Sequence, residues 1–170
     1  MPFTPFHFGP GAAVKAVIPQ HFSFTVFCFA QISMDCEVAY YMVQGSYPWH
    51  RFLHTYVGAT LVAVFSVVVG RPVCQFALRV WSGWRGAPFQ RFFPTSPMIS
   101  WGSAIGGALI GAYSHVLLDS IMHPDIRPLM PFSKANVLYD TVGLTALHVG
   151  CVIPGLFAAI YLASKYKRNV

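Results

Sequence analysis

The stretch "SHVLLDSIMHPD", residues 114–125, carries three side chains of types that commonly bind metals in proteins. His115, Asp119 and His123 follow one another at intervals of four, at the end of an apolar run that begins at Ile99. Residues i and i+4 lie one turn apart on the same face of a helix. His115 and Asp119 can therefore offer an imidazole nitrogen and a carboxylate oxygen to one cation.

Further ionisable residues occur in pairs elsewhere in the chain. His50 and His54 repeat the interval of four, and Asp35 and Glu37 form an acidic pair. A mixed set of nitrogen and oxygen ligands favours zinc, with manganese or iron as alternatives, over calcium or magnesium. The four cysteines form no CxxC pair, which argues against a structural thiolate site and favours an open, water-bearing one.

The composition predicts a membrane protein. Of the 170 residues 55% are hydrophobic and only 9% are charged, whereas about 25% of residues are charged in a soluble domain. The length suits one membrane-embedded domain, residues 1–170, and the N-terminus lacks the basic start of a cleavable signal peptide. The basic residues are scattered over loops and the tail, so the net charge of +6 does not indicate a nucleic-acid partner.

Four segments have the length and apolar character of a spanning helix, which needs about 20 residues. They are Phe22–Val43, Phe52–Val69, Ser100–His123 and Thr141–Ala163, and an end of the second at Trp81 is an alternative. The first contains the polar residues Gln31, Asp35 and Glu37. The shorter segment Gly11–Ile18, closed by Pro19, is expected to be a half-helix that folds back on the first span. We therefore predict an all-α integral membrane helical bundle of about four spanning helices plus a short N-terminal half-helix.

The ionisable pairs lie near the ends of the predicted spans. If consecutive spans alternate in direction, these ends all lie on the same side of the membrane. Such groups cost at least about 2.5 kcal/mol each near the centre of a membrane helix, so they normally pair or serve a function. The half-helix is expected to return His7 to the level of Asp35, and His148 is expected to share a helix face with Asp140. The predicted metal ligands are His7, Asp35, His50, His54, His115, Asp119, His123 and His148.

The basic residues indicate how the chain is oriented. Residues Gly70–Pro97 are expected to form a loop that carries Arg71, Arg79, Arg85 and Arg91. The spans place this loop on the same face as the basic tail, Lys165–Arg168. Lys and Arg cluster on cytoplasmic loops of membrane proteins, so this face and the C-terminus are expected to be cytoplasmic.

Taken in order, these motifs resemble a family of bacterial membrane-bound metal-dependent hydrolases, the LexA-binding, inner-membrane-associated hydrolases. The resemblance runs from His7 to Ser133. Its motifs are "TPFHFGPGA" with His7, "MDCE" with Asp35 and Glu37, "HRFLHT" with His50, Arg51 and His54, "SHVLLDSIMHPD", and "PFS" at Pro131–Ser133. Met34 stands where the family has proline, and the histidines of "HRFLHT" are four apart where the family usually has five.

The resemblance implies a multi-pass protein of the bacterial inner membrane that hydrolyses its substrate with a metal-activated water. The order of the motifs is also similar to zinc-dependent phospholipase C, which implies a phosphoester substrate, with a phospholipid as the best fit. Under this hypothesis Glu37 orients the water or acts as a base, and Arg51 neutralises charge on the substrate.

Two other classes of protein remain open from the sequence. One is a non-catalytic membrane subunit of a larger complex, whose polar residues hold a structural metal, bind a pigment or haem, or dock a membrane-protein partner. The other is a metal or proton transporter, because intramembrane His and Asp residues can also form a relay. A closed site would favour the subunit, and a polar path across the membrane would favour transport.

Overall fold

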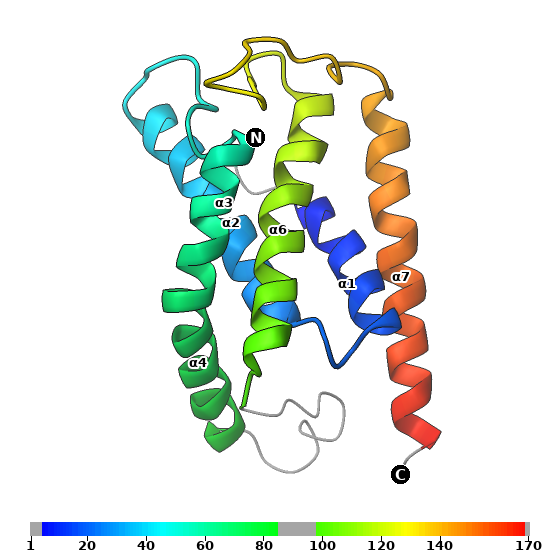
Figure 1. The fold of residues 1–170 in the computed structure, drawn as a ribbon. Coiled ribbons are helices and arrows are strands. Elements are labelled where there is room, and N and C mark those ends of the chain that lie inside the picture. Colours follow the sequence, from blue (N-terminus) through cyan, green and yellow to red (C-terminus); the bar gives the residue numbers. More distant parts are fainter. Residues whose placement is uncertain (1–4, 85–97, 169–170) are drawn as a thin grey trace.

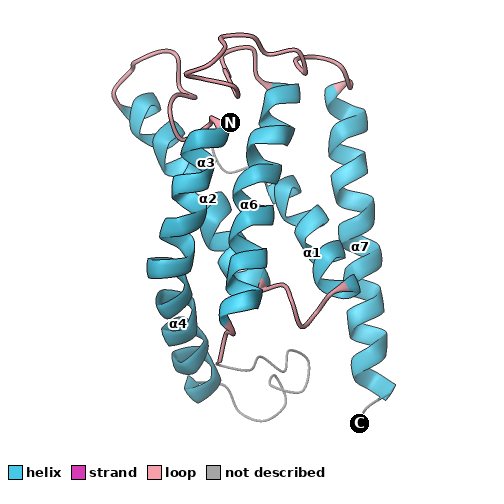
Figure 2. Cartoon of the chain, in the orientation of Figure 1, coloured by secondary structure: helices cyan, strands magenta, loops and turns pink. Residues whose placement is uncertain are grey.

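The computed structural model describes residues 5–84 and 98–168, and within these ranges the chain consists of helices joined by loops, without strands (Figure 2). The prediction of an all-α fold is confirmed. The elements in chain order are η1 (Pro5–His7), α1 (Phe8–Val17), α2 (Phe24–Val43), α3 (Tyr56–Phe65), η2 (Ser66–Gly70), α4 (Arg71–Trp84), α6 (Trp101–Met122) and α7 (Leu144–Arg168).

Side-chain caps fix where three of the helices begin. Ser23, Thr55 and Ser100 precede α2, α3 and α6 with extended backbone conformations. In each case the side-chain oxygen accepts a hydrogen bond from the backbone N–H three residues later. Such a cap satisfies one of the N–H groups that a helix start leaves without a partner.

Three helices of the described chain, rather than the predicted four, are long and apolar enough to cross a membrane. They are Tyr56–Trp81, Trp101–Met122 and Leu144–Leu162. The segment predicted as the first span forms the 20-residue helix α2. Its three polar residues, Gln31, Asp35 and Glu37, make α2 less apolar than the other three, so length alone does not qualify it.

The extension of the second span to Trp81 is confirmed. The predicted loop at Gly70–Pro97 is therefore wrong over its first half, where Arg71–Trp84 is the helix α4. Helices α3 and α4 are joined without a break through the π-helical turn η2. Proline lacks the N–H that an α-helix interior needs, and Pro72 comes directly after this wider turn, so the helix continues past it. Two of the four arginines, Arg85 and Arg91, lie outside the described residues.

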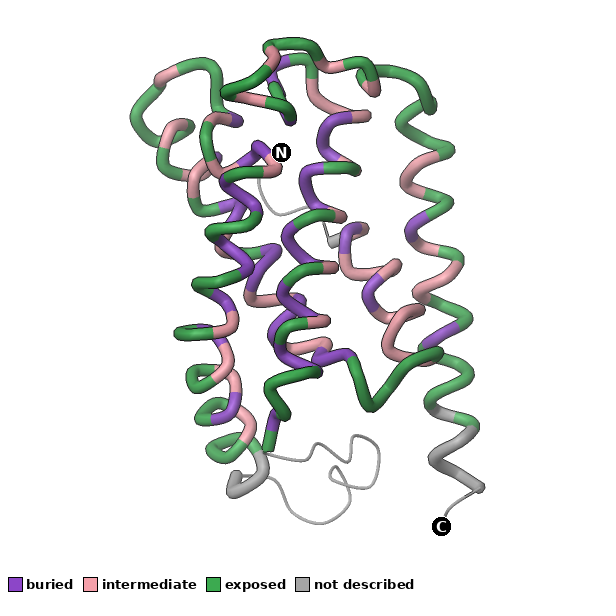
Figure 3. Tube along the Cα trace, in the orientation of Figure 1, coloured by how far each residue is buried: buried purple, intermediate pink, exposed green. Residues whose placement is uncertain are grey.

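Helices α2, α3 and α6 pack around the core, with buried residues facing one another (Figures 1 and 3). The inner face of α6 is a stripe of small residues, Ala104, Gly107, Ala108, Gly111 and Ala112, all buried. Small residues let two helix backbones approach closely, which is how helices commonly associate in membranes. A Cβ at Gly111 would lie 2.9 Å from the carbonyl oxygen of Phe27 on α2.

The same stripe continues into the polar motif of α6. His115 and Asp119 follow Ala112 at helical spacing, and both are buried on the inner face. The close packing of α6 against α2 therefore carries these two side chains into the bundle interior rather than towards lipid.

Helix α7 lies to one side of the bundle and contacts it mainly through α1 (Figure 1). Apolar side chains such as Leu156, Phe157 and Ile160 are exposed along α7, as expected for a helix that faces lipid. The backbones of α1 and α7 meet at Gly9 and Gly155, where an added Cβ at either glycine would collide with the other helix.

Replacing Gly9 by alanine is expected to lower the free energy of unfolding by about 1–3 kcal/mol, the usual cost of overpacking. The reason is that the new Cβ would overlap the carbonyl oxygen of Cys151. Thermal unfolding of the protein in detergent micelles, followed by circular dichroism, measures the change. Gly150→Ala on α7 is the matched control, because a Cβ there meets nothing within 4 Å. Equal stability of the two variants would contradict the close helix contact.

Candidate metal centre

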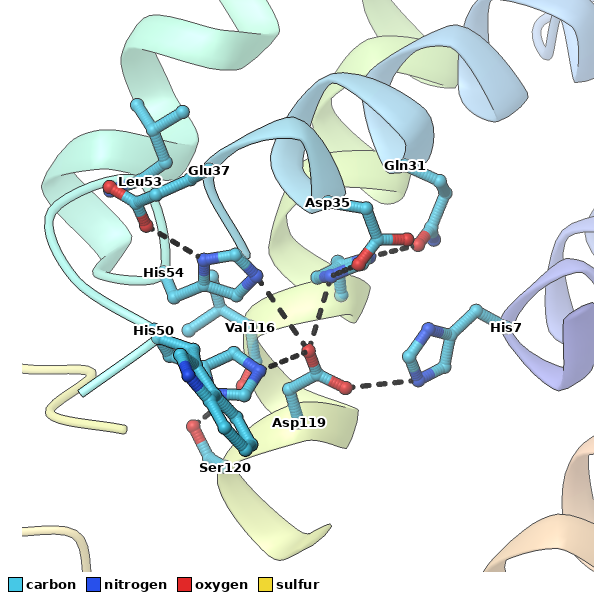
Figure 4. A network of polar contacts seen from close by, with 12 residues as sticks. His7, Gln31, Asp35, Glu37, His50, Leu53, His54, Val116, Asp119 and Ser120 are labelled. Carbon is cyan, nitrogen blue, oxygen red and sulfur yellow. Dashed lines mark hydrogen bonds and ion pairs between the residues drawn. The ribbon is translucent and has the colours of Figure 1, made fainter. Parts of the chain in front are cut away.

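Six of the eight predicted ligands converge at one end of the bundle, from four separate parts of the chain (Figure 4). The turn η1 supplies His7 and α2 supplies Asp35. The segment before α3 supplies His50 and His54, and α6 supplies His115 and Asp119. The expectation that His7 returns to the level of Asp35 holds, since both residues lie beside His115.

Asp119 lies at the middle of this cluster. Its Oδ1 is 3.2 Å from Nε2 of His7, and its Oδ2 is 3.2 Å from Nε2 of His115. The same Oδ2 is 3.8 Å from Nε2 of His54 and 3.9 Å from Nε2 of His50. All five residues are buried. Four imidazoles thus turn the same ring nitrogen towards one carboxylate.

Several of these inward-facing atoms have no hydrogen-bond partner. The Nε2 atoms of His7, His54 and His115 and the Oδ1 of Asp119 are all buried and have no hydrogen-bond partner. The nitrogens of His7 and His115 nevertheless lie 3.2 Å from the carboxylate of Asp119. Buried polar atoms are nearly always paired, and leaving one unpaired costs about 1–3 kcal/mol. A divalent cation takes these imidazole nitrogens and carboxylate oxygens as ligands, so the residues fit a metal.

Glu37 lies behind His54, on the side away from the centre. Its Oε2 lies 3.0 Å from Nδ1 of His54 and accepts from the backbone N–H of Arg51, and its Oε1 accepts from the N–H of Leu53. With Nδ1 protonated by this contact, Nε2 of His54 keeps its lone pair for the centre. Burial lowers the pKa of His54, with the Glu37 hydrogen bond opposing, so the ring is neutral at neutral pH.

Two further residues, Asp125 and Gln31, hold the rings of His50 and His115 in the same way, and neither was predicted to belong to the centre. Asp125 lies 2.9 Å from Nδ1 of His50 and also accepts its backbone N–H. The side-chain oxygen of Gln31 lies against Nδ1 of His115. Both had a signal in the sequence: Asp125 closes the "HPD" of the opening motif, and Gln31 lies one turn before Asp35.

His123, a predicted ligand, lies at the edge of the cluster. Its ring stacks on that of His50 at 4.4 Å between centroids, and it forms an outer group with His50 and Asp125. His123 is only partly buried, unlike the inner ligands. Burial lowers the pKa of His123 to about 4, since the opposing charges of Asp119 and Asp125 do not compensate for it.

Two predicted site residues lie away from the cluster. His148 stacks on Phe6 at 4.4 Å and belongs to none of the metal-capable groups in the described chain. Asp140 has a positive φ in the loop before α7, so the predicted helix face shared with His148 does not exist. The guanidinium of Arg51 lies over the ring of Tyr41, 3.7 Å from its centroid, and donates to the Pro48 carbonyl and the Ser46 hydroxyl.

No protein-family model matches the chain, and neither a curated protein nor a solved structure matches it. Function must therefore be inferred from the side chains of the centre and from the motifs that carry the sequence resemblance.

Replacing Glu37 by glutamine is expected to weaken zinc binding about 10- to 100-fold, the usual effect of losing the partner of a metal-bound histidine. The reason is that the glutamine NH₂ would face a backbone N–H, since both oxygens of Glu37 accept hydrogen bonds. Competition with a chromophoric chelator measures the affinity. Asp140→Asn, which changes the acidic residue outside the cluster, is the matched control; equal affinities in the two variants would contradict the positioning role.

The metal-free protein is expected to lose stability as the pH falls from about 6.5 towards 4. An unfolded histidine binds its proton near pH 6.5, whereas folded His123 does so only near pH 4, so stability rises with pH across this window. His123→Asn is therefore expected to flatten the dependence of the melting temperature on pH. The matched control is His21→Asn at an exposed position. An unchanged pH dependence in His123→Asn would contradict the burial of a neutral His123.

Proposed function

We propose that this protein is a membrane-embedded metal-dependent hydrolase that acts on a phosphoester, with a phospholipid as the best fit. The single observation that carries the proposal is the group of buried, unpaired Nε2 and carboxylate atoms around Asp119. A protein interior keeps such atoms unpaired only at a cost, and a bound cation removes that cost.

The inner residues would hold the metal through His7, His50, His54, His115 and Asp119, with Asp35 beside His115. A divalent metal at such a site supplies Lewis acidity, which activates water for attack and stabilises charge on a phosphoryl oxygen. The chain itself orients the ligands: Glu37 and Asp125 fix the rings of His54 and His50. The mixed set of nitrogen and oxygen donors favours zinc, manganese or iron as the bound metal.

The place of the cluster in the bundle supports a lipid substrate. His115 and Asp119 lie in the last two turns of α6, a helix long enough to cross a membrane. Exposed aromatic residues, Tyr47 and Trp49, lie in the segment that leads to His50. Tyrosine and tryptophan favour the boundary between lipid and water. A centre at the boundary between lipid and water would meet the phosphate groups of lipids. The protein would be a multi-pass protein of the bacterial inner membrane with a cytoplasmic C-terminus.

A non-catalytic membrane subunit is the second candidate, and the burial of the ligands favours it. His54 and His115 are fully buried and Asp119 is 3% exposed, as in a closed structural metal site. Transport has less support. From Ala104 to Ala112, N-terminal to His115, the buried residues of α6 are alanines and glycines, which offer no polar path across the membrane. Hydrolysis of a substrate separates the first two candidates, since a structural metal would leave phosphoesters intact.

The wild-type protein is expected to release product from one or more members of a panel of phosphodiesters and phospholipids in a zinc- or manganese-dependent reaction. The variant His115→Ala/Asp119→Ala is expected to retain no metal and to lose at least about 100-fold of the activity, because both inner ligands are gone. His148→Ala is the matched control, since its ring lies outside the cluster. Bound metal without hydrolysis of any substrate would favour the structural subunit, and unchanged activity in the double variant would refute the proposal.

A further inference from the structure

The loop between α6 and α7, residues 123–143, is tied to the ends of all three helices that are able to cross a membrane (Figure 1). It joins Met122 at the end of α6 to Leu144 at the start of α7. The carbonyl of Pro128 in this loop accepts a hydrogen bond from the backbone N–H of Tyr56, the first residue of the third such helix. The hydrocarbon core of a bilayer ends where its spanning helices end. The loop is therefore placed at the boundary between lipid and water.

The loop is anchored to the bundle at two points. Near its start, Ile126 is fully buried, and the carboxylate of Asp125 accepts a hydrogen bond from the backbone N–H of Trp49. Further along, the side-chain amide of Asn136 donates to the carbonyl of Ser120 on α6 at 2.9 Å. The residues between these anchors, 127–135, are consequently held at both ends.

Between the anchors the chain makes a turn that presents apolar side chains outward. The backbone N–H groups of Phe132 and Ser133 both donate to the carbonyl of Leu129, at 2.9 and 3.1 Å. Phe132 is 88% exposed, Leu129 is exposed beside it, and the loop around them is largely exposed as well (Figure 3). We call residues 129–133 the apolar turn. Apolar groups gained at a fixed, exposed position are favourable only against an apolar surrounding, and such patches mark membrane or protein contacts.

The charges next to the apolar turn are basic. Arg127 precedes it and Lys134 follows it, and both residues are exposed. The two acidic residues of the loop are placed differently: Asp125 faces the ring of His50, and Asp140 lies at the far end, before α7. Apolar side chains flanked by Lys and Arg are typical of segments that insert into the headgroup region of anionic membranes. Lipid is also the surrounding that the adjoining helix ends already bring to the turn, which favours a bilayer over a protein partner.

We propose that the apolar turn inserts Leu129 and Phe132 into the adjacent lipid leaflet, with Lys134 against the phosphates of anionic lipids. The inference does not depend on the proposed hydrolase, because it uses no metal ligand and no step of hydrolysis. Its consequence for the centre is that the loop which carries Asp125, the partner of His50, is held at the membrane surface.

A nitroxide spin label at residue 132 tests the insertion in the full-length protein, reconstituted in vesicles of phosphatidylcholine and phosphatidylglycerol. Cys36, the exposed one of the four cysteines, is first replaced by serine. The label on Phe132→Cys is expected to be accessible to O₂, which dissolves in lipid, and shielded from a water-soluble Ni²⁺ chelate. Ala135→Cys is the matched control: it is exposed and lies next to the anchored Asn136, so its label is expected to stay accessible to the chelate.

The headgroup contact is tested by adding Lys134→Gln to the labelled protein. The ratio of inserted to exposed label at residue 132 is expected to fall about fivefold in vesicles that contain phosphatidylglycerol, the usual contribution of one lysine at an anionic surface. The same substitution is expected to leave the ratio unchanged in vesicles of phosphatidylcholine alone. An equal effect in both vesicles would refute the contact with anionic lipid.

A label at residue 132 that is as open to the Ni²⁺ chelate as the label at residue 135 would overturn the insertion. A label shielded from both the chelate and O₂ would show that protein covers the turn, and would overturn lipid as its occupant. Circular dichroism of the reconstituted variants verifies the helix content, which is expected to be unchanged because the substituted residues 132, 134 and 135 are exposed.

Discussion

The buried carboxylate of Asp119 is the constraint around which this end of the bundle is organised. A lone carboxylate in an apolar interior is costly, and its cost is met only by well-placed partners. Here the surrounding partners are imidazoles that turn Nε2 towards it, three of them at hydrogen-bond distance from a second polar group at Nδ1. Each of these three rings is therefore oriented by its outer contact, so that its inner nitrogen presents a lone pair rather than an N–H group. Such an arrangement suits a cation better than it suits hydrogen bonding within the protein.

The apolar packing of the bundle fixes the backbone positions that bring these ligands together. The small residues of α6 bring its backbone against α2, and the helical repeat then fixes which face His115 and Asp119 occupy. Thr55 caps α3, and its neighbour His54 is anchored by Glu37 of α2. The backbone positions of these ligands are thus set by helix packing and by the cap of α3, and the polar contacts orient their side chains.

Local spacing was enough to predict most of the inner cluster, since the interval of four places His115 and Asp119 on one face whatever surrounds the helix. The alternation of spans and the length of the half-helix then predicted that His7 would join them. Prediction failed where tertiary packing decides. His148 has a suitable position along α7, but its ring is engaged by Phe6. Gln31 and Asp125 acquire their role only through rings that lie more than 70 residues away along the chain. The loop expected at Gly70–Pro97 was wrong in its first half, because the π-helical turn that continues α3 into α4 cannot be recognised from residue spacing.

The cluster is held unequally on its two sides, and this follows from the chain topology. His50, His54 and His115 belong to the segment and helices that pack directly against one another, and each has its second nitrogen engaged. His7 ends η1, directly before α1, which lies between this body and α7, and neither of its ring nitrogens has a hydrogen-bond partner. The position of His7 therefore depends on the glycine contact between α1 and α7. Helix α7 contacts the rest of the bundle mainly through α1. The position of this lipid-facing helix and that of the least constrained ligand, which directly precedes α1, are therefore coupled.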